Sequence, residues 1–150
     1  MVLRDIIRIA KLIVEVIELP DFNDRGAAYA WILRVIDLAK EVAALSPSTV
    51  DDRVVDALSR LAANEAAVMA ILDFVLELLP QRRFKSSLTP SERIEVVADV
   101  LGTLERDAYG AFCENGYQAQ VDAIAQKAGI DVILLAKILS IIIQLIVRLL

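Results

Sequence analysis

The sequence predicts an all-α protein, a compact bundle of about six or seven helices that ends in a very hydrophobic helix. Of its 150 residues, 57% are hydrophobic but only 5% are aromatic, so aliphatic residues and alanine supply the apolar content. Alanine and leucine favour helices. Only five glycines and four prolines interrupt the chain, and the apolar positions follow helical rather than alternating spacing. The length is typical of one domain, so we expect residues 1–150 to form a single helical domain.

The first two predicted helices are separated by Pro20. The first covers about residues 2–19, where charged residues recur at intervals of three or four and so share one stripe. All other directions of this helix are mostly apolar. Asn23 and Asp24 are N-cap residue types, so the second helix is expected to follow them and to run to about residue 45. The charged stripe consists of Arg4, Arg8, Lys11, Glu15 and Glu18.

Two more helices are predicted between the break at residues 45–48 and Pro80. Ser48 or Thr49 is expected to cap the third helix, and Asn64 the fourth. The alternative is that these two segments form one long, kinked helix. Their expected ends lie near residues 63 and 79.

Clear start and stop signals bound the remaining helices. Thr89 is a predicted N-cap, Pro90 suits the first helical position, and Glu92 completes a capping box. Asn115-Gly116 predicts a turn, and Gly129 is typical of a helix C-terminus. The helices expected between these signals cover about residues 89–106, 109–113, 117–128 and 131–150.

Composition excludes several classes of function. The chain has no histidine, which removes the Ser-His and Cys-His nucleophile pairs and the histidine ligands of di-iron bundles. The net charge of −5 lacks the basic excess of a typical nucleic-acid-binding domain. Cys113 is the single cysteine, so no intramolecular disulfide is expected, and a reducing compartment is consistent with this. We therefore expect no enzyme activity, no cofactor and no metal site.

The first nineteen residues are apolar but do not resemble a cleavable signal peptide. Charged residues interrupt the stretch that should be uncharged, and no small-residue cleavage site follows it. The sequence assigns no compartment, and both a reducing compartment and a membrane surface are consistent with it.

The segment from Ile130 to Leu150 is the most unusual part of the sequence, because its length of about 20 residues is enough to span a bilayer. Its interior polar residues fall within a stripe roughly 80° wide on a helix. All other directions are aliphatic. The polar stripe consists of Lys137, Ser140, Gln144 and Arg148.

Three interpretations of this terminal helix compete. It is the central helix of a bundle, with its polar stripe reaching solvent or pairing with carboxylates such as Asp73 and Glu77. Alternatively, it is buried between copies of the chain, because large apolar faces usually mark interfaces. The third interpretation is membrane insertion, which its interior charges oppose.

One basic cluster, Arg82, Arg83 and Lys85 around Phe84, is where the chain would contact phosphate or anionic lipid. The simpler interpretation is favourable charge near a helix C-terminus. The leading functional hypothesis is a non-enzymatic protein that self-assembles, as a homo-oligomer or as a coat-like shell subunit. The alternative is a membrane-associated or pore-forming protein that inserts its C-terminal helix.

Overall fold

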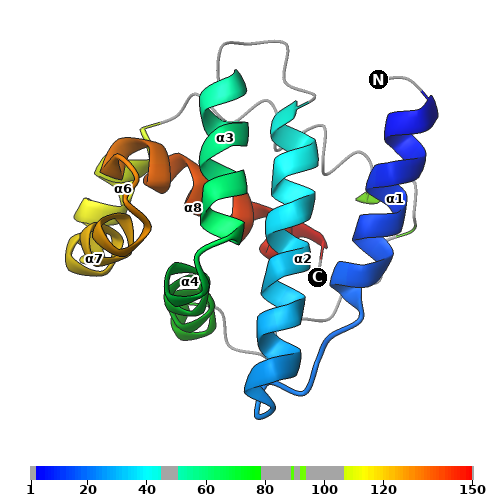
Figure 1. Ribbon diagram of the computed structural model, residues 1–150, viewed down its shortest axis with the longest axis horizontal. Coiled ribbons are helices and arrows are strands. Elements are labelled where there is room, and N and C mark those ends of the chain that lie inside the picture. The colour runs from blue at the N-terminus through cyan, green and yellow to red at the C-terminus, as the bar shows by residue number, and fades with distance from the viewer. Residues whose placement is uncertain (1–2, 45–50, 79–88, 90–91, 94–106, 150) are drawn as a thin grey trace.

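The computed structural model describes residues 3–44, 51–78, 89, 92–93 and 107–149. Within these ranges the chain is helical and contains no strand, which confirms the predicted fold class. Figure 1 shows α2 and α3 side by side, with α8 crossing behind them, α1 at one edge and α6 and α7 at the other. The helices are α1 (Leu3–Ile17), α2 (Arg25–Ala44), α3 (Asp51–Ala62), α4 (Glu65–Leu78), α6 (Ala108–Glu114), α7 (Gln118–Ala128) and α8 (Val132–Leu149).

Two of the predicted N-caps, Asp24 and Asn64, cap the N-terminal ends of α2 and α4. The Asp24 carboxylate accepts hydrogen bonds from the backbone N–H groups of Gly26 at 3.0 Å and Ala27 at 3.2 Å. The Asn64 side-chain oxygen accepts one from the Ala67 N–H at 3.1 Å. Because Asn64 caps a new helix, α3 and α4 are separate helices rather than one kinked helix.

The capping box is also confirmed. The Thr89 N–H donates to the Glu92 carboxylate at 3.0 Å, and the Glu92 N–H donates to the Thr89 hydroxyl at 3.2 Å. The hydrogen bond from the Thr89 backbone lowers the pKa of Glu92 below its ordinary value. The rest of the helix predicted after this box lies outside the described residues, as do the predicted caps Ser48 and Thr49.

A tight connection joins α7 to α8. Gly129 has a φ of +65°, a left-handed conformation that ends α7 and that glycine adopts without strain. Asp131 then accepts hydrogen bonds from the N–H groups of Ile133 and Leu134 at 3.1 and 3.2 Å. Asp131 therefore acts as the N-cap of the terminal helix.

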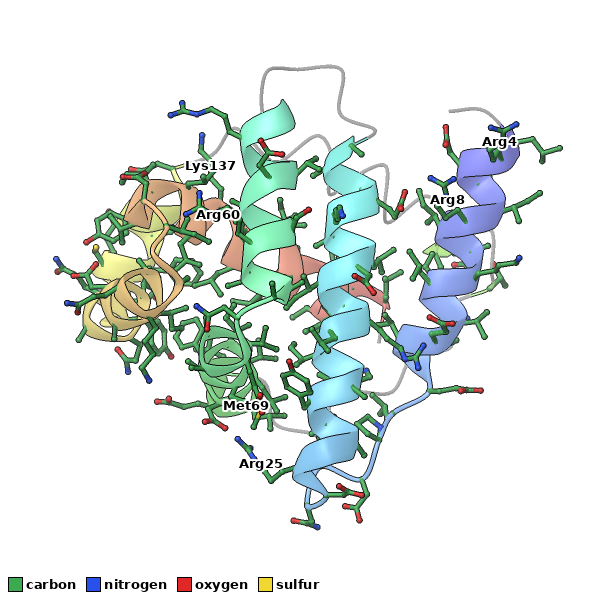
Figure 2. The ribbon with its side chains drawn as sticks, in the orientation of Figure 1. Arg4, Arg8, Arg25, Arg60, Met69 and Lys137 are labelled. Carbon is green, nitrogen blue, oxygen red and sulfur yellow. The ribbon has the colours of Figure 1, made fainter. Side chains whose placement is uncertain are left out.

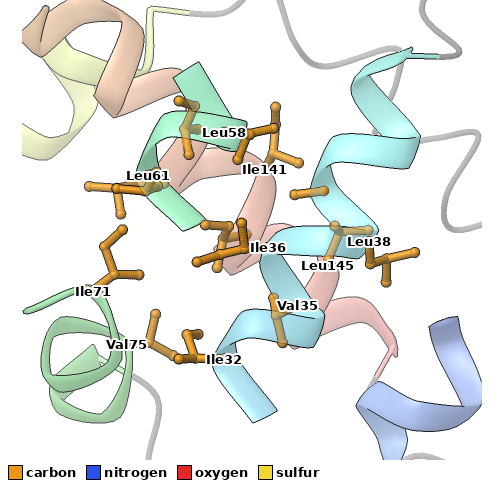
Figure 3. Packing of buried hydrophobic residues seen from close by; sticks show 14 of the residues in the cluster. Ile32, Val35, Ile36, Leu38, Leu58, Leu61, Ile71, Val75, Ile141 and Leu145 are labelled. Carbon is orange, nitrogen blue, oxygen red and sulfur yellow. The ribbon is translucent and has the colours of Figure 1, made fainter. Parts of the chain in front are cut away.

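The core is built around α8. Its residues Ile141 and Leu145 lie among side chains of α2 and α3, including Ile36 and Leu58 (Figure 3). In the described part of the chain every buried residue is apolar. Burial of apolar side chains is therefore the main contribution that holds the helices together.

Trp31 fastens α1 to α2. Its indole N–H donates to the backbone carbonyl of Val16 at 2.8 Å, and the Phe22 ring meets it edge to face at a centroid distance of 5.2 Å. Trp31 is buried, so this hydrogen bond is shielded from water. It fixes the C-terminal end of α1 and so determines which face of that helix meets the bundle.

Candidate interaction surface

The polar stripe of α8 lies at an edge of the bundle. Lys137, Ser140, Gln144 and Arg148 are each half-buried, while nine other residues of the helix are fully buried. The Gln144 amide donates to the Ser140 hydroxyl at 2.9 Å. This arrangement is the one expected for a central bundle helix whose stripe reaches solvent.

The two carboxylates considered as partners of this stripe lie on α4 and are exposed. Asp73 forms an ion pair with Arg25 at 2.9 Å instead, which joins α4 to the start of α2. Figure 2 shows Arg25 at the bottom of the view and Lys137 well above it, at the upper left. Glu77 lines a groove between α4 and α7, together with Lys127.

A largely apolar cavity lies beside α8. It has a volume of about 260 Å³ and lies between α6, α8 and the end of α4. Phe112 and Ile143 form part of its wall, with Ser140 and Gln144 as polar groups. No carboxylate, cysteine, lysine or arginine is among the described residues that line it. Tyr117 is the titratable side chain among the described residues of its wall.

The described residues contain no group of three or more acidic or cysteine side chains able to hold a metal ion. Among the described residues, the largest shift in pKa is that of Tyr109. Its hydroxyl donates a hydrogen bond to the Asp122 carboxylate at 2.8 Å. This bond raises the tyrosine pKa to about 12. It joins α6 to α7 at an exposed position and is a structural contact. The basic cluster Arg82, Arg83 and Lys85 lies outside the described residues.

Helix α1 has two apolar faces. One carries Ile9, Ile13 and Val16, which are buried in the core. The other carries side chains that face solvent: Leu3 is 72% exposed and Val14 55%. Together with Ile7, at 48%, they are half of the six large hydrophobic residues that are exposed in the described chain. We call Leu3, Ile7, Ala10, Val14 and Ile17 the outer stripe.

The outer stripe has the spacing of a helix-pairing seam. Its members follow one another at intervals of four, three, four and three residues, as do the core positions of a coiled coil. At about 100° per residue they fall within a sector of roughly 80°. In the structure α1 packs mainly against α2, at the edge of the molecule (Figure 1). Leu3, Ile7 and Val14 of the outer stripe therefore face solvent, whereas Ile17 at its end packs partly against the core.

Charged side chains lie on one flank of the outer stripe. Arg8 pairs with Glu41 of α2 at 3.4 Å, and Glu15 pairs with Arg34 at 2.9 Å. These two contacts hold α1 on α2. Burial raises the pKa of Asp37, which lies in the same charged groove between the helices. Arg4 and Lys11 of α1 and Glu18, just after its end, are also exposed and lie next to the outer stripe. Lys11 also lines the groove that contains Asp37.

Sequence reasoning identified the charged stripe of α1 but did not divide its apolar remainder into two faces. The signal was present in the regular spacing of Leu3, Ile7, Ala10, Val14 and Ile17. What the sequence alone does not provide is the side of α1 on which α2 packs, because both apolar faces suit a bundle core.

No family model, curated protein or solved structure matches this chain. Helix α8 is the one helix in the described chain that is long and apolar enough to cross a membrane, and half of it is buried inside the bundle. Function is therefore inferred from the surfaces of the protein itself. Within the described residues, the outer stripe of α1 is the surface on which three large apolar side chains, Leu3, Ile7 and Val14, are exposed together.

Proposed function

We propose that this chain is a non-enzymatic structural protein that self-assembles into a homo-oligomer through the outer stripe of α1. The observation that supports this is the exposure of Leu3, Ile7 and Val14 on a single helix face that the bundle leaves uncovered. Scattered exposed apolar residues are ordinary, whereas an apolar row along one helix face marks a binding surface. The regular spacing of the row suits another helix as the binding partner.

A non-enzymatic role is supported by how the polar side chains are used. Asp73, Glu15 and Glu41 each form an ion pair that joins two helices. The described residues that line the cavity beside α8 include no carboxylate, and the chain lacks histidine. The polar groups therefore serve as links between helices and as a soluble outer face.

The surface favours a small closed oligomer over an extended shell. A shell subunit needs at least two different interfaces, because one self-complementary patch closes as a pair. The other exposed large hydrophobic residues are Leu19, Ile133 and Val147. Ile133 and Val147 share a face of α8, but they are two heptads apart and the polar residues Lys137, Ser140 and Gln144 lie between them. Among the described residues, the outer stripe of α1 is therefore the exposed row that no polar side chain interrupts.

Membrane association is the second candidate, and the length and hydropathy of α8 favour it. To insert, α8 would have to withdraw nine buried side chains from the core, including Ile141 and Leu145. That step would expose the apolar faces of α2 and α3, which pack against it. Self-assembly through α1 requires no such rearrangement, so it is the preferred proposal.

Absolute mass from light scattering on the purified full chain, with and without a mild detergent, distinguishes these functions. Self-assembly predicts a discrete multiple of the 16.5 kDa chain mass in buffer alone. A monomer at all micromolar concentrations contradicts the proposal. Protein that stays in solution only with detergent also contradicts it and supports membrane association.

A further inference from the structure

We infer that the partner of α1 is the α1 helix of a second copy, and that the two helices run antiparallel about a two-fold axis at Ala10. This inference rests on the proposed self-assembly and specifies its geometry. It follows from the order of side-chain sizes and charges along the helix. Both are symmetric about the middle of α1 in a way that suits an antiparallel pair.

The apolar layers match when the helices run in opposite directions. With Ala10 on the axis, Leu3 of one copy lies opposite Ile17 of the other, and Ile7 lies opposite Val14. The small Ala10 side chain at the centre allows the two backbones to approach closely. Each larger side chain on either side of Ala10 then packs against a side chain of similar size from the other copy.

The charges next to the outer stripe follow the same symmetry. Arg4 is near the start of α1, Lys11 near its middle and Glu18 just after its end, all on one flank. In an antiparallel pair, Arg4 of each copy lies opposite Glu18 of the other. The two copies therefore form two Arg4–Glu18 ion pairs. The two Lys11 side chains meet at the axis, and their length lets both ammonium groups turn into solvent.

The parallel arrangement lacks this complementarity. There the charged flank of one helix faces the opposite flank of its partner, which in α1 carries Ile6 and Ile13. Ile13 is buried in its own core and Ile6 is half-buried. A parallel pair therefore brings charged groups against aliphatic ones and forms no ion pair between copies.

A second copy is also a better partner than an unrelated basic or acidic helix. The charged flank carries Arg4 and Lys11 in the first two thirds of the helix and Glu18 after its end. A wholly basic partner helix would be repelled by Arg4 and Lys11, and a wholly acidic one by Glu18. Arg8 and Glu15 do not change this order, since both are engaged with α2. α1 is therefore complementary to a second α1 helix that runs in the opposite direction.

Disulfide cross-linking of the full chain determines the orientation. In a Cys113→Ser background, Ala10→Cys is expected to cross-link to itself, because the two-fold axis brings both copies of that position together. A mixture of Leu3→Cys and Ile17→Cys is expected to form the mixed disulfide, whereas Leu3→Cys alone stays uncrosslinked. Circular dichroism verifies that each variant keeps its helical content.

Charge reversal supplies an independent readout that needs no new cysteine. Arg4→Glu or Glu18→Arg alone is expected to weaken association by about 3- to 10-fold, because each places like charges opposite one another in both pairs. The double variant restores the ion pairs in swapped order and should return association close to that of the natural chain.

The outcomes separate the two proposals. Self-linking of Leu3→Cys, with no mixed disulfide, shows a parallel pair and overturns this inference while leaving self-assembly intact. Association that no α1 cysteine captures and no charge reversal alters overturns the inference as well. A natural chain that stays monomeric overturns both the inference and the proposed function.

Discussion

Val14→Asp tests the outer stripe at a position where the structure supplies a matched control. Val14 on α1 is 55% exposed, and Val147 on α8 is 54% exposed. Each lies in the last turn of its helix, so an introduced carboxylate meets a similar helix dipole in both places. The two substitutions should therefore affect the isolated chain alike, and each should change the free energy of unfolding by less than about 0.5 kcal/mol.

Their effects on association should differ. Full burial of a valine side chain is worth about 1.5–2 kcal/mol, so covering the exposed half of Val14 contributes roughly 1 kcal/mol per copy. A two-fold pair contains the site twice, and the aspartate adds the cost of bringing a carboxylate against apolar side chains. The total of at least about 2 kcal/mol corresponds to a dissociation constant raised at least about 30-fold.

Sedimentation velocity over a wide range of protein concentration measures this constant for both variants. Val14→Asp should shift the protein to monomer, while Val147→Asp should retain the self-association of the natural chain. Equal weakening by the two variants would show that association depends on general hydrophobicity. No weakening by Val14→Asp would remove the outer stripe from the interface.

Three further predictions concern the bundle itself. Trp31→Phe leaves the Val16 carbonyl without its buried donor and should lower the free energy of unfolding by about 1–3 kcal/mol, measured by urea denaturation; an unchanged stability would mean that this bond does not fasten α1. Asn64→Ala removes both the cap of α4 and a 3.0 Å hydrogen bond to a carbonyl near the end of α7, so it should cost about 1–2 kcal/mol, whereas Asn64→Ser keeps a cap and should cost less. Because the bond to Asp122 raises the pKa of Tyr109 from 10.0 to about 12, its contribution to stability is present below pH 10.0 and is lost as the pH rises towards 12. Tyr109→Phe should therefore flatten the fall in melting temperature over that range, and an unchanged slope would contradict this.

Local signals in the sequence predicted most of the secondary structure. Asp24, Asn64 and Gly129 were recognised because a cap or a left-handed turn depends on the residue itself and on its immediate neighbours. Helix boundaries that fall inside the described ranges agree with the predicted ones to within two residues. Thr89 and Glu92 form the predicted capping box for the same reason.

Long-range features were less predictable. The sequence showed that α8 was unusually apolar but left three roles open, and only its packing against α2 and α3 places it in the core. Asp73 was considered as a partner of the α8 stripe, yet it pairs with Arg25. Both outcomes depend on which helices are neighbours, a property of the whole fold that spacing along one helix does not determine.

The central claim is that copies of this chain associate through α1 while α8 stays in the core, and hydrogen exchange of the natural chain at low and high protein concentration tests it most directly. Association through the outer stripe should slow exchange in peptides covering residues 3–17 as concentration rises, because pairing suppresses opening of α1. Exchange in residues 132–149 should already be slow at low concentration and should change far less. Protection that appears with concentration in α8 but not in α1 would contradict the claim and identify the terminal helix as the contact between copies.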